Sequence, residues 1–146
     1  MKALSRLHSV VFRATRGYLG RRLVNNDMLL LTTLGELSGK KHTVPLLYLR
    51  ADDRFIVIAS YGGRPTDPQW YRNLVAHPTA SVQIENTRHA VTATAMSKDE
   101  RSLWWPRIVE AYADYAVYQS RTDRTIPVVW LEQVSDDSQQ TTDNSR

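Results

Sequence analysis

The stretch that decides the fold is residues 29–49, LLLTTLGELSGKKHTVPLLYL. Two apolar, β-prone runs, residues 29–34 and 44–49, enclose a polar segment with two glycines, a serine and two lysines. Apolar runs on both sides of such a segment predict a β-hairpin with a long loop. The loop can turn backbone N–H groups and lysine ammonium groups toward one point, which suits an anion such as a phosphate. A solvated turn is the alternative that the pattern leaves open.

Composition limits the class of protein. The 146 residues carry 19 Lys+Arg and 15 Asp+Glu, a net charge of +4, and no cysteine. We expect one domain over residues 1–134, because this length can bury a core without disulfides. The absence of thiols fits a reducing cytoplasm, where we expect the protein. The basic excess favours anionic partners in general and is too small to indicate nucleic acid.

The two ends of the chain differ from the middle. Apolar residues recur every three or four positions over residues 4–18, which predicts an amphipathic helix over about residues 3–20. Its basic side chains allow two alternatives, docking on its own domain or contact with an anionic membrane surface. No apolar run approaches the roughly 20 residues that span a bilayer. The first residues lack the pattern of a signal peptide, so we expect no export. Residues 135–146 lack apolar side chains, which predicts a disordered tail.

The middle of the chain continues with a third strand and a helix. Residues 55–60 are apolar enough for a strand buried on both faces. Gly62 and Gly63 directly after it indicate a sharp turn or a close approach, and a plain loop is the alternative that the residues by themselves favour. Asp67 and Pro68 predict a helix start, with Asp67 as the cap. In that helix Trp70 is expected in the core, and the amide of Asn73 suits a polar ligand.

The last third predicts strands at residues 80–85, 89–95 and 127–131. Ser97 and Glu100 form a capping box that begins a helix, and Pro106 is expected to kink or divide it. Three phenols follow at intervals of three residues, Tyr112, Tyr115 and Tyr118. Two alternatives stay open for this row, because phenols pack in cores and also meet solvent or ligands through their hydroxyls.

Together these elements predict an α+β protein with six mainly antiparallel strands. Strands two and three, like four and five, are joined by connectors too short for parallel crossovers, which favours a small closed or partly closed barrel with helices outside. The chain lacks HExxH, Walker, Gly-x-Ser-x-Gly and GxGxxG patterns, and its four histidines show no ligand spacing, so no metal is expected. A cofactor that performs the chemistry itself fits what remains.

Five motifs in order, with the spaced tyrosines as a sixth, carry a family resemblance over residues 29–131. They are TTLG with SGKKHTVPLLYL, IASYGG, DPQWYRNL, ERSLWWP and RTDRTIPVV. The chain closely resembles the deazaflavin-dependent nitroreductase family. The resemblance implies a split β-barrel like that of FMN-binding proteins, as a monomer or homodimer. It also implies that reduced coenzyme F420 passes hydride to a quinone, a nitro compound or another electron-poor acceptor.

The resemblance also implies the site residues. The phosphate-bearing tail of the cofactor would be held by Ser38, Gly39, Lys40, Lys41 and His42. The body of the cofactor would lie along Thr43, Val44, Pro45, Leu46 and Leu47. The deazaflavin ring would be lined by Ile58, Ala59, Ser60 and Tyr61 and covered by Gln69, Trp70, Tyr71, Arg72 and Asn73. The acceptor would face Tyr112, Tyr115 and Tyr118, with Tyr115 also near the cofactor. Catalytic roles would fall to Ser60, Tyr115 and Tyr118, through hydrogen bonds or a proton relay.

One part of the loop departs from the family. Glu36 and Leu37 stand where the family usually has Arg-Lys, and His42 stands where it often has arginine. Each missing charge-assisted hydrogen bond to a phosphate would weaken binding by roughly 1.5–3 kcal/mol, unless Lys40 and Lys41 compensate. The departure leaves an alternative function open, a non-catalytic binder of FMN, another flavin-like molecule or a lipid.

Overall fold

The computed structural model describes residues 28–134. The predicted N-terminal helix, with its contact to an anionic membrane, and the predicted polar tail lie outside the described residues. Within the described part, no helix is both long and apolar enough to cross a membrane. The strands are β1 Met28–Leu34, β2 Lys41–Leu47, β3 Leu49–Ala51, β4 Arg54–Ile58, β5 Thr79–Ile84, β6 Thr87–Ala95 and β7 Val128–Gln133. The helices are η1 Tyr61–Gly63, α3 Gln69–Ala76, α4 Lys98–Ala111 and α5 Asp114–Ser120.

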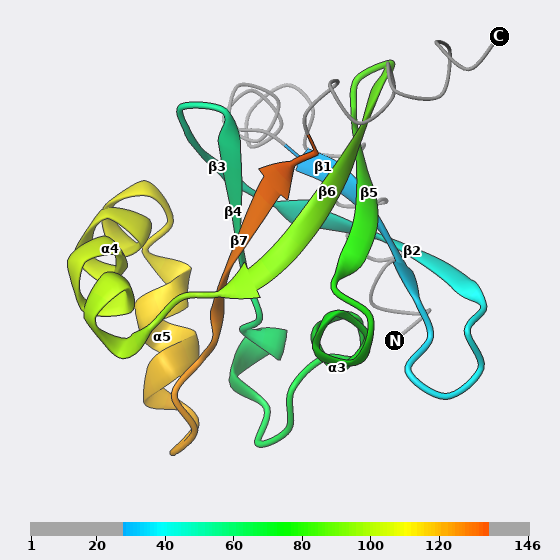
Figure 1. The fold of residues 1–146 in the computed structure, drawn as a ribbon. Helices are drawn as coiled ribbons and strands as arrows, with labels where there is room; N and C mark the ends of the chain where they lie inside the picture. The colour runs from blue at the N-terminus through cyan, green and yellow to red at the C-terminus, as the bar shows by residue number, and fades with distance from the viewer. Residues whose placement is uncertain (1–27, 135–146) are drawn as a thin grey trace, which may run out of the picture.

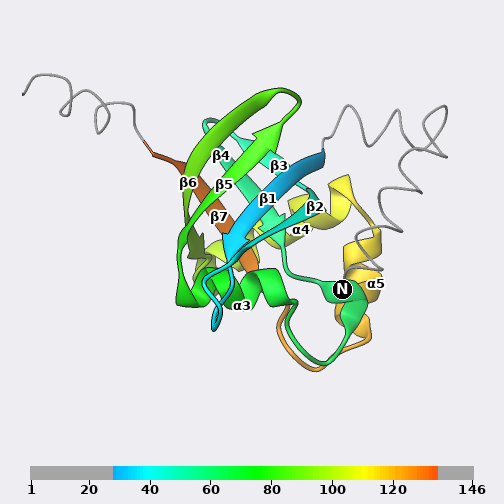
Figure 2. The same cartoon turned by 90° about the vertical axis from the view of Figure 1, so that its right-hand side faces the viewer.

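The strands form one curled sheet in the order β2-β1-β5-β6-β7-β4-β3, and every pair is antiparallel (Figure 1). The antiparallel prediction is confirmed, but the prediction of six strands is wrong. The run 44–49 breaks at Tyr48, because Leu46 pairs with Leu29 of β1 whereas Leu49 pairs with Ile56 of β4. The consecutive strands β2 and β3 thus stand at opposite edges of the sheet, and the sheet curls to bring these two edges together (Figure 2).

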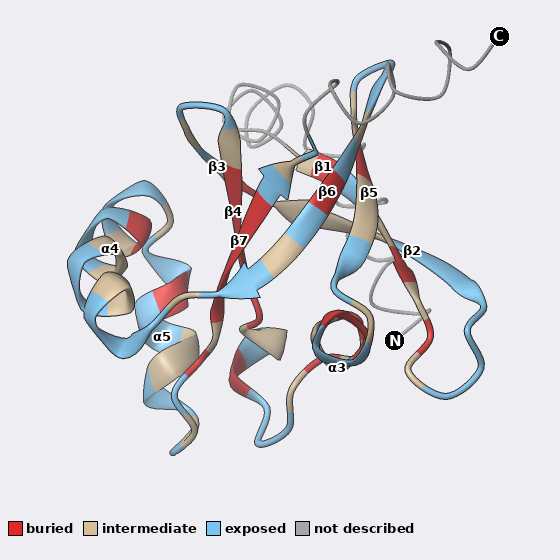
Figure 3. Cartoon of the chain, in the orientation of Figure 1, coloured by how far each residue is buried: buried red, intermediate tan, exposed pale blue. Residues whose placement is uncertain are grey.

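Two apolar clusters hold the sheet. Alternate residues of β1, including Leu29 and Leu31, point inside the curl, where Trp70 and Leu74 of α3 pack on them. The other cluster lies under α4 and α5. Strand β4 contributes to both, with Val57 in the first and Ile56 in the second, so its predicted burial on both faces is confirmed (Figure 3).

The helix boundaries correct two expectations. Helix α3 begins at Gln69 after Pro68 and has no side-chain cap, so the prediction of Asp67 as its cap is wrong. The Asp67 carboxylate binds Arg124 instead, which satisfies its charge more fully than a backbone N–H. The capping box that begins α4 is confirmed. Pro106 does not divide this helix, because the carbonyl that loses its donor belongs to exposed Ser102.

Candidate active site

The elements that carry the predicted site residues gather at one end of the curled sheet (Figures 1 and 2). The β1–β2 loop, residues 35–40, lies beside α3. On the other side of α3 in space lie η1 and then α5. Helix α3 contacts β1, and α5 contacts η1. Segments far apart in the sequence are therefore brought together here, as the motif order implied.

The β1–β2 loop is held by its own backbone. The Gly35 N–H donates to the Lys40 carbonyl at 2.7 Å, and the Gly39 N–H donates to the Gly35 carbonyl at 2.9 Å. Gly39 has φ +68°, which favours glycine. A Cβ atom on Gly35 would meet Ser38 Oγ at 2.5 Å and His42 Nε2 at 3.1 Å. The side chains of Ser38 and His42 therefore converge over Gly35.

The cations around this loop face different sides. Lys40 and Lys41 are exposed. Successive residues of a strand alternate between its faces, so Lys41 and His42 point in opposite directions. Arg72 on the exposed side of α3 donates to Gln69 Oε1 at 2.6 Å. The five loop residues implied by the resemblance are thus divided between two faces of the hairpin.

Asn73 ties α3 to the hairpin. Its Oδ1 accepts from the Glu36 N–H and from Gln69 Nε2, both at 2.9 Å, and its Nδ2 donates to Thr33 Oγ1 at 3.0 Å. The residue is 1% exposed. We expected this amide to serve a polar ligand, but its hydrogen bonds go to the protein. Asn73 therefore ties the loop and β1 to α3.

Helix α3 separates two environments. At about 100° per residue, Asn73 and Tyr71 lie on opposite flanks of buried Trp70. Tyr71 lines a small open cavity of about 170 Å³ against β6 and β7, with Ala93 and Val129 among its walls. Burial raises the pKa of the Tyr71 phenol, and nearby Asp67 raises it further. The predicted covering residues are thus split between the loop side and the β6–β7 side.

The predicted run along β2 is split in the same way. Val44 and Leu46 pack on the core inside the curl. Thr43, Pro45 and Leu47 lie on the other face, and Thr43 Oγ1 is 2.8 Å from Thr32 Oγ1. One side of a ligand can therefore meet only alternate members of this run.

The segment after β4 turns sharply. Ser60 has φ −72° and ψ −38°, whereas Tyr61 has φ +48°, which is rare for a residue with a side chain. Gly62 and Gly63 also have positive φ, and a Cβ atom on Gly63 would come 2.5 Å from the Tyr118 carbonyl oxygen. The paired glycines thus mark both a sharp turn and a close approach, and the plain loop that the residues by themselves favoured is wrong. Ser60 and Tyr61 stay half-buried at the surface of this turn.

The tyrosine row is not on one helix. Tyr112 is the C-cap of α4, while Tyr115 and Tyr118 lie on α5. Their rings stack edge to face, with centroids 6.0 Å apart in each successive pair. Tyr115 is buried and packs beside Ile58 in the outer cluster, and the other two rings are half-buried.

The surroundings of Tyr115 and Tyr118 favour the protonated form of both phenols. Burial raises the pKa of Tyr115 far above its ordinary value, and the neighbouring phenols and Asp114 add to this. Burial also raises the pKa of Tyr118, with Asp114 acting in the same direction and Arg121 against it. At neutral pH the hydroxyls of Tyr115 and Tyr118 therefore keep their protons and are able to donate hydrogen bonds.

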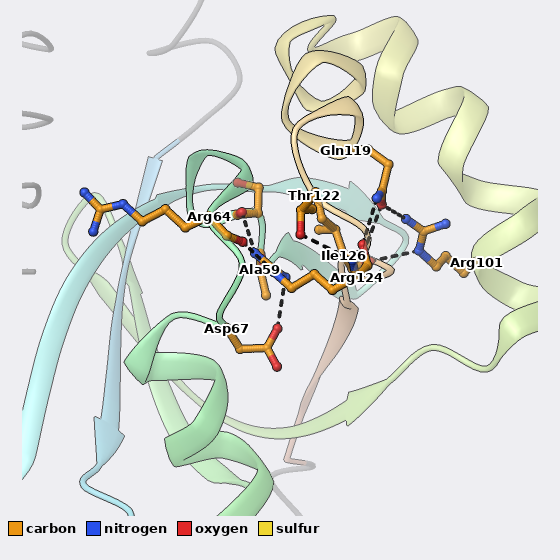
Figure 4. A network of polar contacts seen from close by, with 9 residues as sticks. Ala59, Arg64, Asp67, Arg101, Gln119, Thr122, Arg124 and Ile126 are labelled. Carbon is orange, nitrogen blue, oxygen red and sulfur yellow. Dashed lines mark hydrogen bonds and ion pairs between the residues drawn. The ribbon is translucent and has the colours of Figure 1, made fainter.

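One residue of the motifs contacts the site segment and was missed by the site prediction. The Arg124 guanidinium donates to the carbonyls of Ala59 and Ser60. The Arg124 carbonyl accepts from Gln119, whose side-chain oxygen accepts from Arg101 (Figure 4). Arg124 belongs to the motif RTDRTIPVV. An arginine three positions before the predicted strand 127–131 was the available signal, but its partners lie about sixty residues away.

The donors at this end of the sheet fit a cofactor with a phosphate and a flat ring. Ser38 and His42 converge at the loop with Lys40 beside them, which suits an anion. Beyond α3, at the same end of the sheet, Ser60 and the tyrosine rings offer polar and aromatic surface. Among residues 28–134, no three histidine, aspartate or glutamate side chains gather to hold a metal ion.

Comparisons with known proteins agree with this fit. The family model described as F420H(2)-dependent quinone reductase matches residues 4–133. An F420H(2)-dependent quinone reductase of Mycobacterium tuberculosis is 38% identical over 132 residues, which cover 88% of this chain and 89% of that protein.

Two solved structures resemble the chain. An F420-H2 dependent reductase, FDR-A, has a TM-score of 0.66 and 44% identity, over 72% of this chain and 93% of that chain. A structure described as a domain-swapped dimer has a TM-score of 0.63 and 36% identity, over 86% and 98%. Because the family model spans most of the sequence, the chain belongs to the F420H(2)-dependent quinone reductase family.

Proposed function

We propose that this protein uses reduced F420 to reduce a quinone or another electron-poor acceptor, such as a nitroaromatic compound. The bound deazaflavin would supply the hydride. The observation that carries the proposal is the Asn73 tie, which joins the anion-suited loop to the helix that follows the Ser60 turn. Family membership supports the same cofactor and reaction.

In this proposal the loop holds the charged tail of the cofactor. Ser38, Gly39 and His42 approach from the hairpin, Lys40 lies beside them, and exposed Arg72 adds charge from α3. The ring lies against Ser60 and Tyr61. Trp70 and Tyr115, which are buried, contribute by packing beneath these surfaces and excluding water.

Tyr118 and Tyr112 orient the acceptor in this proposal, because they form the half-buried rim of the tyrosine row. A hydrogen bond from the Tyr118 hydroxyl to an acceptor oxygen would favour charge that develops there. The raised pKa of Tyr118 makes it a poor proton source, so the proton of the product comes from water.

The test is anaerobic mixing of the purified protein with reduced F420 and menadione. We expect the absorbance of oxidised F420 to return, faster with protein than without it. Ser60→Ala and Tyr118→Phe should slow this at saturating cofactor by roughly 10-fold or more each, the usual scale for removing one hydrogen bond from a transition state. No acceleration with menadione or with a nitroaromatic would overturn the proposal.

A second candidate function is a non-catalytic binder of a flavin-like or lipid ligand. It is favoured by Glu36 and by Leu37, which is 95% exposed where a cation would serve a phosphate. Native mass spectrometry of ligand carried through purification separates the two functions. Recovery of FMN or a lipid, together with no affinity for F420, would establish this second candidate.

The same proposal covers the fold type, the location and the oligomeric state of the protein. We assign the curled sheet to the FMN-binding-like split β-barrel type, and the cytoplasm remains the expected location. A homodimer is supported by the relative described as a domain-swapped dimer. Light scattering after size exclusion tests this, and a single mass near the 16.7 kDa of one chain would contradict it.

A further inference from the structure

The guanidinium of Arg124 forms hydrogen bonds with several residues of the segment that leads from β4 to α3 (Figure 4). Its Nη2 donates to the Ser60 carbonyl at 2.7 Å, its Nη1 to the Ala59 carbonyl at 3.1 Å, and its Nε to the Arg64 carbonyl at 2.8 Å. Nη1 also donates to Asp67 Oδ1 at 2.9 Å. The Arg124 side chain is 15% exposed, so these bonds form largely away from water.

These bonds orient the whole turn. A trans peptide is planar, and its C=O and N–H point in opposite directions. With the Ala59 and Ser60 carbonyls held toward Arg124, the N–H groups of Ser60 and Tyr61 must point away from it. The same restraint fixes the backbone from which the Ser60 hydroxyl projects.

The turn needs such a restraint because Tyr61 has φ +48°. A non-glycine residue in this region costs of order 1–3 kcal/mol and persists where its surroundings hold it. Two backbone bonds close the turn, from Gly63 N–H to the Ser60 carbonyl and from Arg64 N–H to the Tyr61 carbonyl. Arg124 adds bonds to carbonyls on both sides of Tyr61.

Arg124 is itself held by α5, the helix that carries Tyr115 and Tyr118. Its carbonyl accepts from Gln119 Nε2 at 2.8 Å, and Gln119 lies on α5. Gln119 Oε1 in turn accepts from Arg101 Nη2 at 2.9 Å and from the Ile126 N–H at 3.0 Å. One chain of contacts therefore runs from α4 through α5 to the turn that holds Ser60.

We propose that Arg124 is a positioning residue, which sets Ser60 and Tyr61 in register with the tyrosines of α5 for the reaction. This inference rests on the proposed function. Only a guanidinium can satisfy such a set, because its planar fork offers five N–H donors, whereas a lysine offers one nitrogen.

The first test uses hydrogen exchange on the protein without cofactor. In Arg124→Gln the amides of Gly63 and Arg64 should exchange at least about 10-fold faster, while the strand amide of Val57 keeps its protection. Arg101→Gln is the matched control, because this half-buried arginine supports the same network without touching the turn. Unchanged exchange in Arg124→Gln, or an equal change in both variants, would overturn the inference.

The second test measures turnover of reduced F420 with menadione. Per folded molecule, Arg124→Gln should lose roughly 10- to 100-fold in kcat, the scale of a small misplacement, with KM for the cofactor nearly unchanged. Arg124→Lys, which keeps the charge opposite Asp67, should fall between this variant and the wild type. A merely structural role would leave kcat per folded molecule equal in Arg124→Gln and Arg101→Gln and would overturn the inference.

The two tests separate this inference from the proposed function. An inactive wild-type protein would contradict the proposed function alone. The exchange comparison would then still decide whether Arg124 orders the turn at Ser60.

Discussion

A single buried amide, that of Asn73, joins the two halves of the candidate site. The sequence drew attention to it because asparagine is a poor helix former. Its partners were beyond local patterns, since Thr33 lies 40 positions away and Glu36 lies 37. Such pairings depend on how the sheet curls, which periodicity does not encode.

Replacing Asn73 should therefore destabilise the fold. Asn73→Ala leaves the Thr33 hydroxyl and the Glu36 N–H without their partner in a buried place. Each unsatisfied buried group costs about 1–3 kcal/mol, so we expect a loss of about 2–4 kcal/mol in the free energy of unfolding by urea. Thr33→Val, which removes one of these bonds at nearly constant volume, should cost less. An equal or larger loss in Thr33→Val would contradict this ordering.

Because the phenol of Tyr115 is buried, we expect the folded protein to lose stability at alkaline pH. Its pKa is raised in the folded protein, so the stabilisation is present below its ordinary pKa of about 10 and is lost as the pH rises above that value. We expect Tyr115→Phe to lose less free energy of unfolding than the wild type above about pH 10, by up to about 1.4 kcal/mol per pH unit.

Tyr118→Phe provides the comparison for this prediction. Tyr118 is half-buried and Arg121 opposes the rise in its pKa, so its removal should reduce the alkaline loss less. Urea unfolding at about pH 8 and pH 11 measures both variants. Identical pH dependence in the wild type and Tyr115→Phe would show that the buried phenol does not control alkaline stability.

At the level of elements, local signals were sufficient wherever local chemistry decides. The Ser97–Glu100 capping box sets the start of α4, and alternating apolar residues set the strands. The break at Tyr48 was invisible because the run 44–49 is apolar throughout and only the change of partner strand divides it. Asp67 failed as a cap because a distant arginine binds its carboxylate.

The capping box allows a matched comparison within one helix. Ser97 Oγ accepts from the Glu100 N–H at 3.2 Å, so Ser97→Ala should cost about 1 kcal/mol of stability in urea unfolding. Ser102→Ala removes a hydroxyl that donates to the Lys98 carbonyl from an exposed position of the same helix. Because alanine is the better helix former there, it should stay within about 0.5 kcal/mol of the wild type. Equal losses would mean that the cap contributes nothing specific.

Over the whole molecule, the order of motifs predicted which elements meet, while the faces of the side chains followed from the fold. The site elements line one end of the sheet, and strand alternation then divides β2 between two faces (Figure 1). Arg124 was absent from the predicted site because its contacts with Ala59 and Ser60 span 65 and 64 positions. Long-range polar contacts of this kind are the part that the sequence alone could not supply.

The charge at the β1–β2 loop gives the last prediction. Asn73 holds the backbone N–H of Glu36 and not its side chain, and the Leu37 side chain is 95% exposed, so we expect substitutions at both positions to leave the loop folded. Glu36→Arg/Leu37→Lys adds two cations and removes an acid beside Ser38 and His42. We expect it to bind F420 at least about 10-fold more tightly in a fluorescence titration, because one charge-assisted hydrogen bond contributes roughly 1.5–3 kcal/mol.

The control must separate local contact from overall charge. Glu110→Arg/Leu103→Lys makes the same two types of change on exposed positions of α4, across the molecule from the loop (Figure 1). Screening over about 10 Å in 0.1 M salt should leave its affinity for F420 near that of the wild type. Equal tightening in both double variants would assign the gain to net charge, and weaker binding in the loop variant would place the anionic tail of the cofactor away from this loop.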